Sequence, residues 1–359
     1  MSRLKLTQEH VEAALLGGCF LGGGGGGSMA KGRALGEAAL SSGPLELVSL
    51  DEIDPEAVVV TCSAVGAPAS KEAMAKPEAA MRVIKLMAKL DVSPPAGLIT
   101  NENGGGSTFN GWLPAAMSGL LLIDAPCNGR AHPTGVMGSM ALHRDNRYVS
   151  KQTAAGGNPE TGRYLEAAFS GPMEAVAALV RQCAVQAGGL VAVARNPVKA
   201  HYLKEHAAPG AVMLAIETGT KMLEARSRGA EAVVQAAVGF LGGRVVTAGT
   251  VDAIDLTTEG GFDHGVVSAG GCELTFWNEF MTLDRGGERL GTFPDLIMTT
   301  DAETGLPITT AELAKGRRVF VTLVPADRIP LGAGMFCREL LEPIEKVVGR
   351  AVLPYVTLK

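Results

Sequence analysis

Aromatic residues are scarce in this chain, and their scarcity limits what it can bind. Phe, Trp and Tyr together make up 4% of its 359 residues. Proteins that bind single-stranded nucleic acid stack the bases on aromatic side chains, and duplex binders carry clusters of Lys and Arg. Here the formal net charge is −5 and the sequence contains no block of basic residues. We therefore expect no nucleic-acid partner.

Long apolar runs are missing as well. A membrane-spanning helix needs about 20 consecutive apolar residues, and no stretch approaches that length. The first ten residues, MSRLKLTQEH, lack the apolar core of a secretory signal. The six cysteines show no CxxC spacing, which is typical of free thiols in a reducing compartment. These absences predict a cytoplasmic protein without a membrane partner.

Familiar cofactor and catalytic motifs are also absent from the sequence. It has no HExxH, no paired CxxC, no GxxxxGK[ST] loop and no GxSxG elbow. We therefore expect no cofactor. Binding of a divalent metal stays open as an alternative, but no spacing of ligand residues supports it.

Glycine, in contrast, is abundant and clustered. Six consecutive glycines occupy positions 22–27, and a second loop, NENGGGST, occupies positions 101–108. Glycine loses more backbone entropy on folding than other residues and buries no side chain, so such runs are expected in loops. Their bare N–H groups suit an anion or a planar polar ligand. Gly24, Gly25, Gly26 and Gly105 are thus candidate ligand-binding residues, with flexible connectors as the alternative.

Alternating patterns over residues 1–170 predict the first domain. Strands are expected at 45–50, 58–62, 97–100 and 121–124, and helices at 29–40, 77–90 and 112–120. A helix that begins after Thr7 is expected to end at Gly17 and Gly18. This order predicts an α/β domain of three layers with a mainly parallel sheet and ligands at the carboxyl ends of its strands.

The remainder of the chain divides into three parts. Residues 171–241 continue the α/β pattern, with a strand at 190–194 and a long helix at 218–241. Residues 242–330 hold short β-branched runs between turns, which predict a second, β-rich domain, a small barrel or sandwich. Residues 331–359 return to a helical pattern at 340–348 and are expected to pack back on the α/β domain. The high content of Gly, Ala and Met suits a homo-oligomer.

The densest group of reactive side chains lies in the segment DAPCNGRAHP at 124–133. Asp124, Cys127 and His132 are candidate catalytic residues, because an imidazole exchanges protons near neutral pH. Asn128 and Arg130 are candidate binding residues, and a guanidinium can hold a substrate carboxylate bidentately. In the alternative interpretation, Asp124 caps the following turn, Arg130 neutralises it and Cys127 fills space in the core.

Three further positions complete the predicted site. Glu102, in the second glycine loop, is a candidate general base, and its neighbours Asn101 and Asn103 are candidate ligand-binding residues. Cys62, at the end of a strand-like run, is either a substrate-facing nucleophile or a buried structural thiol. His264, in GGFDHG, could close over the site, although turn chemistry explains that segment equally well.

Several segments together resemble the S-methyl thiohydantoin desulfurase family, whose relatives are associated with hydantoin-processing enzymes. The matching stretches are 21–27, 45–68, 102–108, 122–130, 208–210, 260–262, 276–279 and 294–297. The resemblance implies an α/β first domain and a β-rich second domain. The chain departs from the usual pattern at Ser28, at Asn103 and Gly106, and at Cys127, Asn128 and His132. These departures indicate a substrate pocket whose side chains differ from those usual in the family.

The resemblance also implies an activity, the hydrolytic desulfurisation of a 2-thiohydantoin. One such substrate carries a propionate at ring position 5 and arises in ergothioneine breakdown. Water activation is then expected from Glu102 or Asp124, and protonation of sulfur from His132 or Cys127, with glycine-loop N–H groups stabilising the anion. A covalent route through Cys127 or Cys62 is the variant. Two other functions stay open: a non-catalytic hydantoin-binding subunit of a hydantoinase system, and a nucleotide-binding enzyme that uses the glycine loops.

Overall fold

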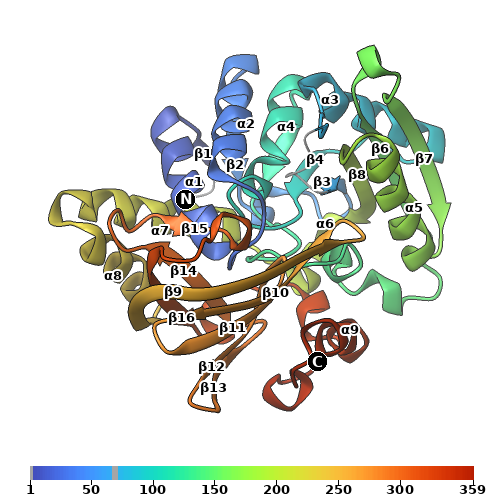
Figure 1. Ribbon diagram of the computed structural model, residues 1–359. Coiled ribbons are helices and arrows are strands. Elements are labelled where there is room, and N and C mark those ends of the chain that lie inside the picture. The colour runs from blue at the N-terminus through green and yellow to red at the C-terminus, as the bar shows by residue number, and fades with distance from the viewer. Residues whose placement is uncertain (1–2, 67–71) are drawn as a thin grey trace.

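Two eight-stranded sheets and their flanking helices make up the computed structural model, which describes residues 3–66 and 72–359 (Figure 1). Ala67 and Pro68, which end one of the stretches of the family resemblance, lie outside the described residues. The strand order of the first sheet is β1-β2-β5-β4-β3-β8-β6-β7. Its strands are β1 (Arg3–Lys5), β2 (Glu46–Val48), β3 (Val58–Gly66), β4 (Gly97–Thr100), β5 (Leu121–Ile123), β6 (Ser150–Gly156), β7 (Leu165–Gly171) and β8 (Leu190–Lys199).

The first sheet is mixed, so the expectation of a mainly parallel sheet is too strong. Strands β2, β5, β4 and β3 pair in parallel. Strands β8, β6 and β7 pair antiparallel, as does β1. The reason is that β6 and β7 form a hairpin and β8 returns beside β3 in the opposite direction. The parallel half carries the two loops in which catalytic residues were predicted.

Helices cover both faces of this sheet. One face packs on α1 (Gln8–Leu21), α3 (Pro77–Leu86) and α4 (Trp112–Ser118), and α2 (Met29–Ser42) packs on α4. The other face packs on α5 (Met173–Gln186) and α6 (Ala200–His206). Val59 and Val60 show the alternation, since they are both buried but belong to the clusters of opposite faces. The predicted α/β class is therefore confirmed.

Two predicted helix boundaries are wrong, and glycine explains both. Helix α1 continues through Gly17 and Gly18 because α7 (Ala211–Ala225) packs directly against it, and a Cβ on Gly17 would overlap the Ala215 carbonyl oxygen. The helix expected at 218–241 is two helices, α7 and α8 (Ala230–Phe240). Gly229, at φ +95°, breaks the chain between them.

The second sheet is antiparallel throughout, which confirms a β-rich second part. Its order is β13-β12-β11-β10-β9-β16-β14-β15. The strands are β9 (Arg244–Glu259), β10 (Phe262–Ala269), β11 (Cys272–Trp277), β12 (Glu279–Arg285), β13 (Glu288–Thr292), β14 (Leu296–Asp301), β15 (Pro307–Ile308) and β16 (Arg318–Val324). The sheet wraps around its own apolar core and also buries side chains against α1, α7 and α8.

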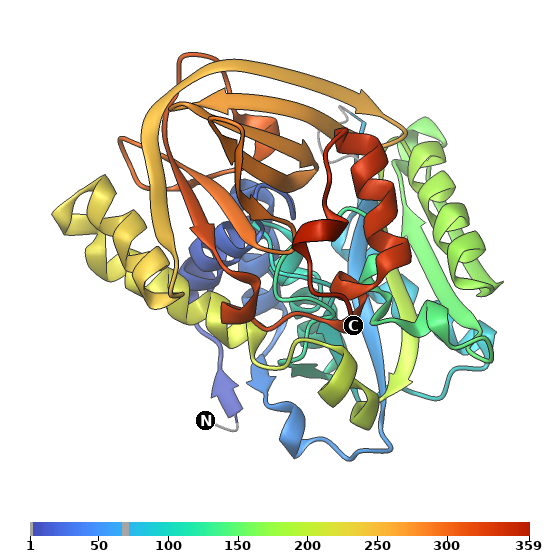
Figure 2. The same ribbon diagram turned by 90° about the horizontal axis from the view of Figure 1, so that it is seen from below.

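The C-terminal helix α9 (Arg338–Val348) contacts both parts of the molecule (Figure 2). Its buried residues Leu341 and Ile344 pack with Trp277 of β11, and the same cluster includes Met137 from the first part of the chain. Across the residues that the structure describes, no helix has the length and apolar character needed to cross a bilayer. The limits of the domains within the chain stay a prediction.

Candidate functional site

Glu102 and His132, two predicted catalytic residues, face each other in the structure. Glu102 follows β4 and His132 lies in the loop after β5, so the two adjacent parallel strands bring them to one edge of the sheet. The Glu102 Oε2 atom is 2.7 Å from Nδ1 of His132, and it also accepts the His132 backbone N–H at 3.2 Å. Ser107 donates its hydroxyl to Oε1 at 2.8 Å. The pair is a carboxylate that orients an imidazole.

The loop around this pair fixes the direction of the imidazole. Asn128 forms a parallel bridge with Glu102, and its Nδ2 atom lies 3.2 Å from His132 Nδ1. The Asn128 amide donates to Nδ1 when that atom is unprotonated, whereas a proton on Nδ1 pairs with the nearer Glu102 carboxylate and leaves Nε2 for proton exchange. The Gly138 backbone lies so close to Nε2 that a Cβ there would overlap it. Both side chains of the pair are buried, with residue exposures of 7% and 8%.

The two glycine loops bind each other. The carbonyl oxygen of Gly26 accepts the N–H groups of Gly106 at 2.8 Å and Ser107 at 2.9 Å. A Cβ on Gly26 would lie 2.5 Å from the Cα atom of Gly104. Because Ser107 also contacts Glu102, the first loop holds the loop that carries Glu102 in place through its backbone. The glycines permit this close approach, which no side chain could accompany.

The first glycine loop also joins the two sheets. Phe280 of β12 donates its N–H to Gly23, and Thr310 donates its N–H to Gly24, at 2.8 and 2.9 Å. Gly25 faces the carboxylate of Glu279, which a Cβ would overlap. Gly24, Gly25 and Gly26 were predicted to bind a ligand, and in the structure they contact protein.

Arg130 points into the same junction. It is fully buried and donates to the carbonyl oxygens of Pro294 at 3.3 Å, of Phe280 at 3.4 Å, and of Asp295. Burial lowers the pKa of Arg130 to about 10, while the charge of Glu279 opposes that shift. Burial also raises the pKa of Glu279 well above its usual range, and the charge of Glu102 adds to this effect. Arg130 is therefore held by carbonyl groups of the second sheet.

Asp124 binds the N-terminus of helix α7. Its two oxygens accept the backbone N–H groups of Val212 at 2.8 Å and Met213 at 3.2 Å, in the first turn of α7. Burial raises the pKa of Asp124 to about 6, and these two N–H groups oppose the rise. Both oxygens thus accept hydrogen bonds from α7. The alternative interpretation expected Asp124 to cap the turn that directly follows it, which is much nearer in the chain.

Cys62 and Cys127 are buried thiols on opposite faces of the sheet. The Sγ atom of Cys127 lies 3.4 Å from the hydroxyl of Thr61. Burial raises the pKa of Cys127 to about 11 and that of Cys62 to about 12. Both groups are therefore thiols at neutral pH, whereas a nucleophile must be the thiolate. Cys62 also lines a cavity of about 80 Å³, beside Lys31, whose pKa burial lowers to about 8.

The remaining predicted binding residues divide between the loops and the second sheet. Asn101 accepts a hydrogen bond from Asn110 at 2.9 Å, and Asn103 donates to the carbonyls of Gly129 and Ala211. The backbone of Gly105 lies against α2. His264 lies on β10, half-buried, and pairs in register with β9 and β11. Within the described parts of the chain, it makes no hydrogen bond to Glu102 or His132.

Sequence reasoning missed Arg195, a buried cation close to the predicted residues. It lies on β8 opposite Thr61 of β3 and is 6% exposed. Its Nε atom donates to the hydroxyl of Ser63 at 2.9 Å, and an Nη atom donates to the same oxygen. Burial lowers the pKa of Arg195, and Cys127 and Glu102 oppose that shift. The available signal was a guanidinium directly after the apolar run at 190–194.

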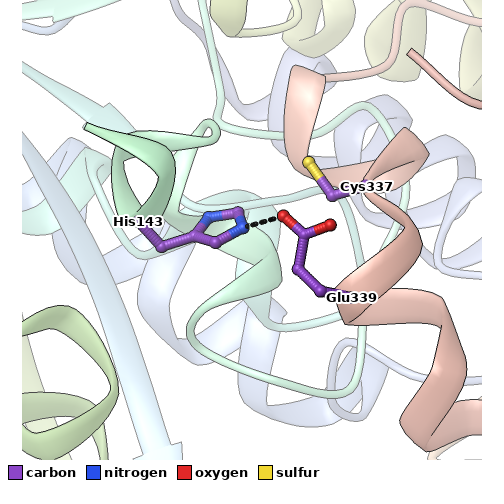
Figure 3. Close-up of side chains that lie close together, drawn as sticks. All are labelled: His143, Cys337 and Glu339. Atoms are coloured by element: carbon purple, nitrogen blue, oxygen red, sulfur yellow. Dashed lines mark hydrogen bonds and ion pairs between the residues drawn. The ribbon is translucent and has the colours of Figure 1, made fainter. Parts of the chain in front are cut away.

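A second cluster of ligand-type side chains lies at the C-terminal helix (Figure 3). His143, Cys337 and Glu339 offer ligand atoms within 4.8 Å of one another, and His143 Nε2 is 2.8 Å from Glu339 Oε1. Arg144, however, donates to both oxygens of Glu339, at 2.7 and 2.9 Å. This hydrogen bonding lowers the pKa of Glu339 to about 2. The Arg144 guanidinium thus binds both oxygens of the Glu339 carboxylate. The cluster holds α9 against the loop after β5.

The fold and this site define a class: a two-part protein in which an α/β unit presents a buried carboxylate–imidazole pair beside a β-rich unit. Comparison with known families gives its identity. A family model described as S-Me-THD-like, N-terminal domain, matches residues 9–163, and one described as S-Me-THD-like, C-terminal domain, matches residues 172–330. The chain belongs to the S-Me-THD-like family, which confirms the resemblance to the S-methyl thiohydantoin desulfurases.

Comparison with individual proteins adds support for the fold. A crystal structure of a protein from Chromobacterium violaceum is similar, with a TM-score of 0.70 and 21% sequence identity over 99% of this chain and 98% of that one. No curated protein matches the chain. The C-terminal family match begins before β8, so the segment that it covers completes the first sheet as well as forming the second.

Proposed function

We propose that the protein is a hydrolase that removes sulfur from a 2-thiohydantoin and releases sulfide. The observation that carries this proposal is the 2.7 Å contact between Glu102 Oε2 and His132 Nδ1, buried at the carboxyl ends of two parallel strands. Membership of the S-Me-THD-like family supports the choice of a thiohydantoin ring. The proposal assigns acid–base catalysis to this pair.

The reaction replaces the thiocarbonyl sulfur by the oxygen of water. His132 Nε2 takes a proton from water as the water oxygen bonds to the ring C2 carbon, and the C=S electron pair moves to sulfur. Glu102 stabilises the imidazolium that forms. The imidazolium then returns its proton to sulfur. As the C2–S bond breaks, the hydroxyl on C2 becomes C=O and its remaining proton passes through His132 Nε2 to the departing hydrosulfide, so sulfur leaves as hydrogen sulfide. Water and thiohydantoin are consumed, and hydantoin and hydrogen sulfide are produced.

A direct attack by water is favoured over a covalent route. Burial holds both Cys62 and Cys127 as thiols at neutral pH, and neither thiol forms a hydrogen bond with His132 in the described residues. A cysteine nucleophile needs a base or a cation that lowers its pKa. The proposed mechanism therefore contains no thioester-like intermediate.

The proposed substrate is a 2-thiohydantoin that carries a propionate, as in ergothioneine breakdown. The protein is proposed to act in the cytoplasm as a homo-oligomer. The test is sulfide release from 2-thiohydantoin-5-propionate by the purified protein, with hydantoin-5-propionate identified as the second product by mass spectrometry. Release of both products in equal amounts supports the proposal. Binding of the hydantoin ring without turnover would favour the non-catalytic subunit instead.

A further inference from the structure

Arg195 and Arg181 are two cations that are fully or partly withdrawn from solvent. Across the described residues, neither guanidinium forms an ion pair with a carboxylate. Arg195 donates to the Ser63 hydroxyl. Arg181, half-buried on α5, donates to the carbonyl of Gly261 at 3.3 Å and lies 4.1 Å from the centre of the Phe262 ring. Both cations are thus held in place by neutral groups.

These two cations lie on the same face of the first sheet, because Val180, next to Arg181 on α5, packs with Val193, which shares a strand face with Arg195. Burial lowers the pKa of Arg181 to about 10, and the charge of Arg195 lowers it further. Two partly desolvated like charges repel, and the repulsion costs free energy unless an anion lies between them. A guanidinium presents planar donors that match a carboxylate. The uncompensated pair therefore suits a ligand that brings its own negative charge.

One loop connects this pair to the proposed catalytic residues. A Cβ on Gly135 would lie 2.8 Å from Nη1 of Arg195, and the backbone of Gly138 contacts Nε2 of His132. The segment from His132 to Gly138 thus reaches both groups. From the other side, the turn between β9 and β10 extends over the first sheet to α5, where Gly261 and Phe262 meet Arg181 (Figure 2).

We propose that Arg195 and Arg181 form an anion subsite that binds the carboxylate of the substrate's side chain and so selects carboxylate-bearing thiohydantoins. This inference rests on the proposed function. It assigns to Arg195 and Arg181 the carboxylate-binding role that the sequence predicted for Arg130. Arg195 supplies the buried charge, while Arg181 and Phe262 close the subsite through the β9–β10 turn.

Ligand binding tests the subsite independently of turnover. Isothermal titration compares hydantoin-5-propionate with the neutral hydantoin-5-propionamide, and free propionate serves as the ring-less anion. We expect the unmodified protein to prefer the acid over the amide by roughly tenfold to a hundredfold, the range of a charge-assisted hydrogen bond. Arg181→Gln and Arg195→Gln should each lose most of this preference. Arg181→Lys should keep part of it, and the matched control Arg228→Gln, at an exposed position, should keep it all.

The outcomes separate this inference from the proposed reaction. Equal affinity for acid and amide, no binding of either, or binding of free propionate as tight as that of the ring compound would overturn the subsite. A preference that survives in both glutamine variants would also overturn it. Sulfide release at equal rates from 2-thiohydantoin-5-propionate and from its neutral propionamide would retain the reaction and refute the subsite. Acid-selective binding of the hydantoins without sulfide release from the thiohydantoin would do the reverse.

Discussion

Replacing Glu102 by Gln should remove the charge of this residue and keep its shape, so that the effect of the charge can be measured alone. The carboxylate accepts two hydrogen bonds, from the Ser107 hydroxyl and the His132 backbone N–H, and its Oε2 atom lies 2.7 Å from His132 Nδ1. A glutamine can turn its NH₂ group toward Ser107, whose hydroxyl also accepts, and keep its oxygen toward His132. We therefore expect Glu102→Gln to fold with the loop geometry preserved.

The expected effects on stability and on turnover differ in size. Hydrogen bonds to a charged group contribute roughly 1.5–3 kcal/mol and neutral ones roughly 0.5–1.5, but removal of a buried charge returns part of its desolvation cost. The net loss in the free energy of unfolding should be about 1 kcal/mol. Turnover should fall at least about a hundredfold, because general acid–base catalysis contributes about 10²–10⁴, which is about 3–5 kcal/mol of barrier.

Sulfide release and urea unfolding measured on the same preparations check this expectation. Ser107→Ala is the matched control, since it removes one hydrogen bond to Oε1 but keeps the carboxylate, and it should retain most of the turnover. The reasoning is refuted if Glu102→Gln unfolds like the unmodified protein and still turns over within about tenfold of it.

Three further substitutions test the other assignments. His132→Ala should lower sulfide release at least about a hundredfold with a near-native unfolding curve, and near-normal release would remove His132 from the mechanism. Arg130→Met should lower the free energy of unfolding by about 2–4 kcal/mol, because the carbonyl oxygens of Phe280, Pro294 and Asp295 lose their buried donor. A variant as stable as the unmodified protein in urea unfolding would contradict the junction role. In the native protein at neutral pH, Cys62 and Cys127 should resist alkylation as followed by mass spectrometry. Cys127→Ser should change turnover less than about tenfold, and a larger loss would revive the covalent route.

Local pattern predicted several elements well. The strand expected at 97–100 is β4 (Gly97–Thr100), and the short β-branched runs expected over 242–330 include β16 (Arg318–Val324). Short apolar runs between glycine-rich or polar turns carry enough information for this. Pattern failed at Gly17 and Gly18, which were expected to end a helix. Gly17 packs against α7 and Gly18 against Thr108, and both partners are far away in the sequence.

The candidate site was predictable only in part. Glu102 and His132 each stood out by chemistry beside a strand end, and adjacent parallel strands then brought them together. Asp124 and Arg130 stood out for the same reason, yet their partners are the first turn of α7 and carbonyls of the second sheet. Such partners are fixed by long-range packing, which no local spacing encodes.

The sequence by itself determined the class of the chain: an α/β part, a β-rich part, two glycine-rich loops and membership of a thiohydantoin-related family. These properties follow from periodicity, composition and ordered short segments. Only the tertiary structure decided which polar side chains are free to act. Burial and pairing depend on contacts between segments far apart in the chain, as when Arg195 on β8 comes to lie opposite Thr61 on β3.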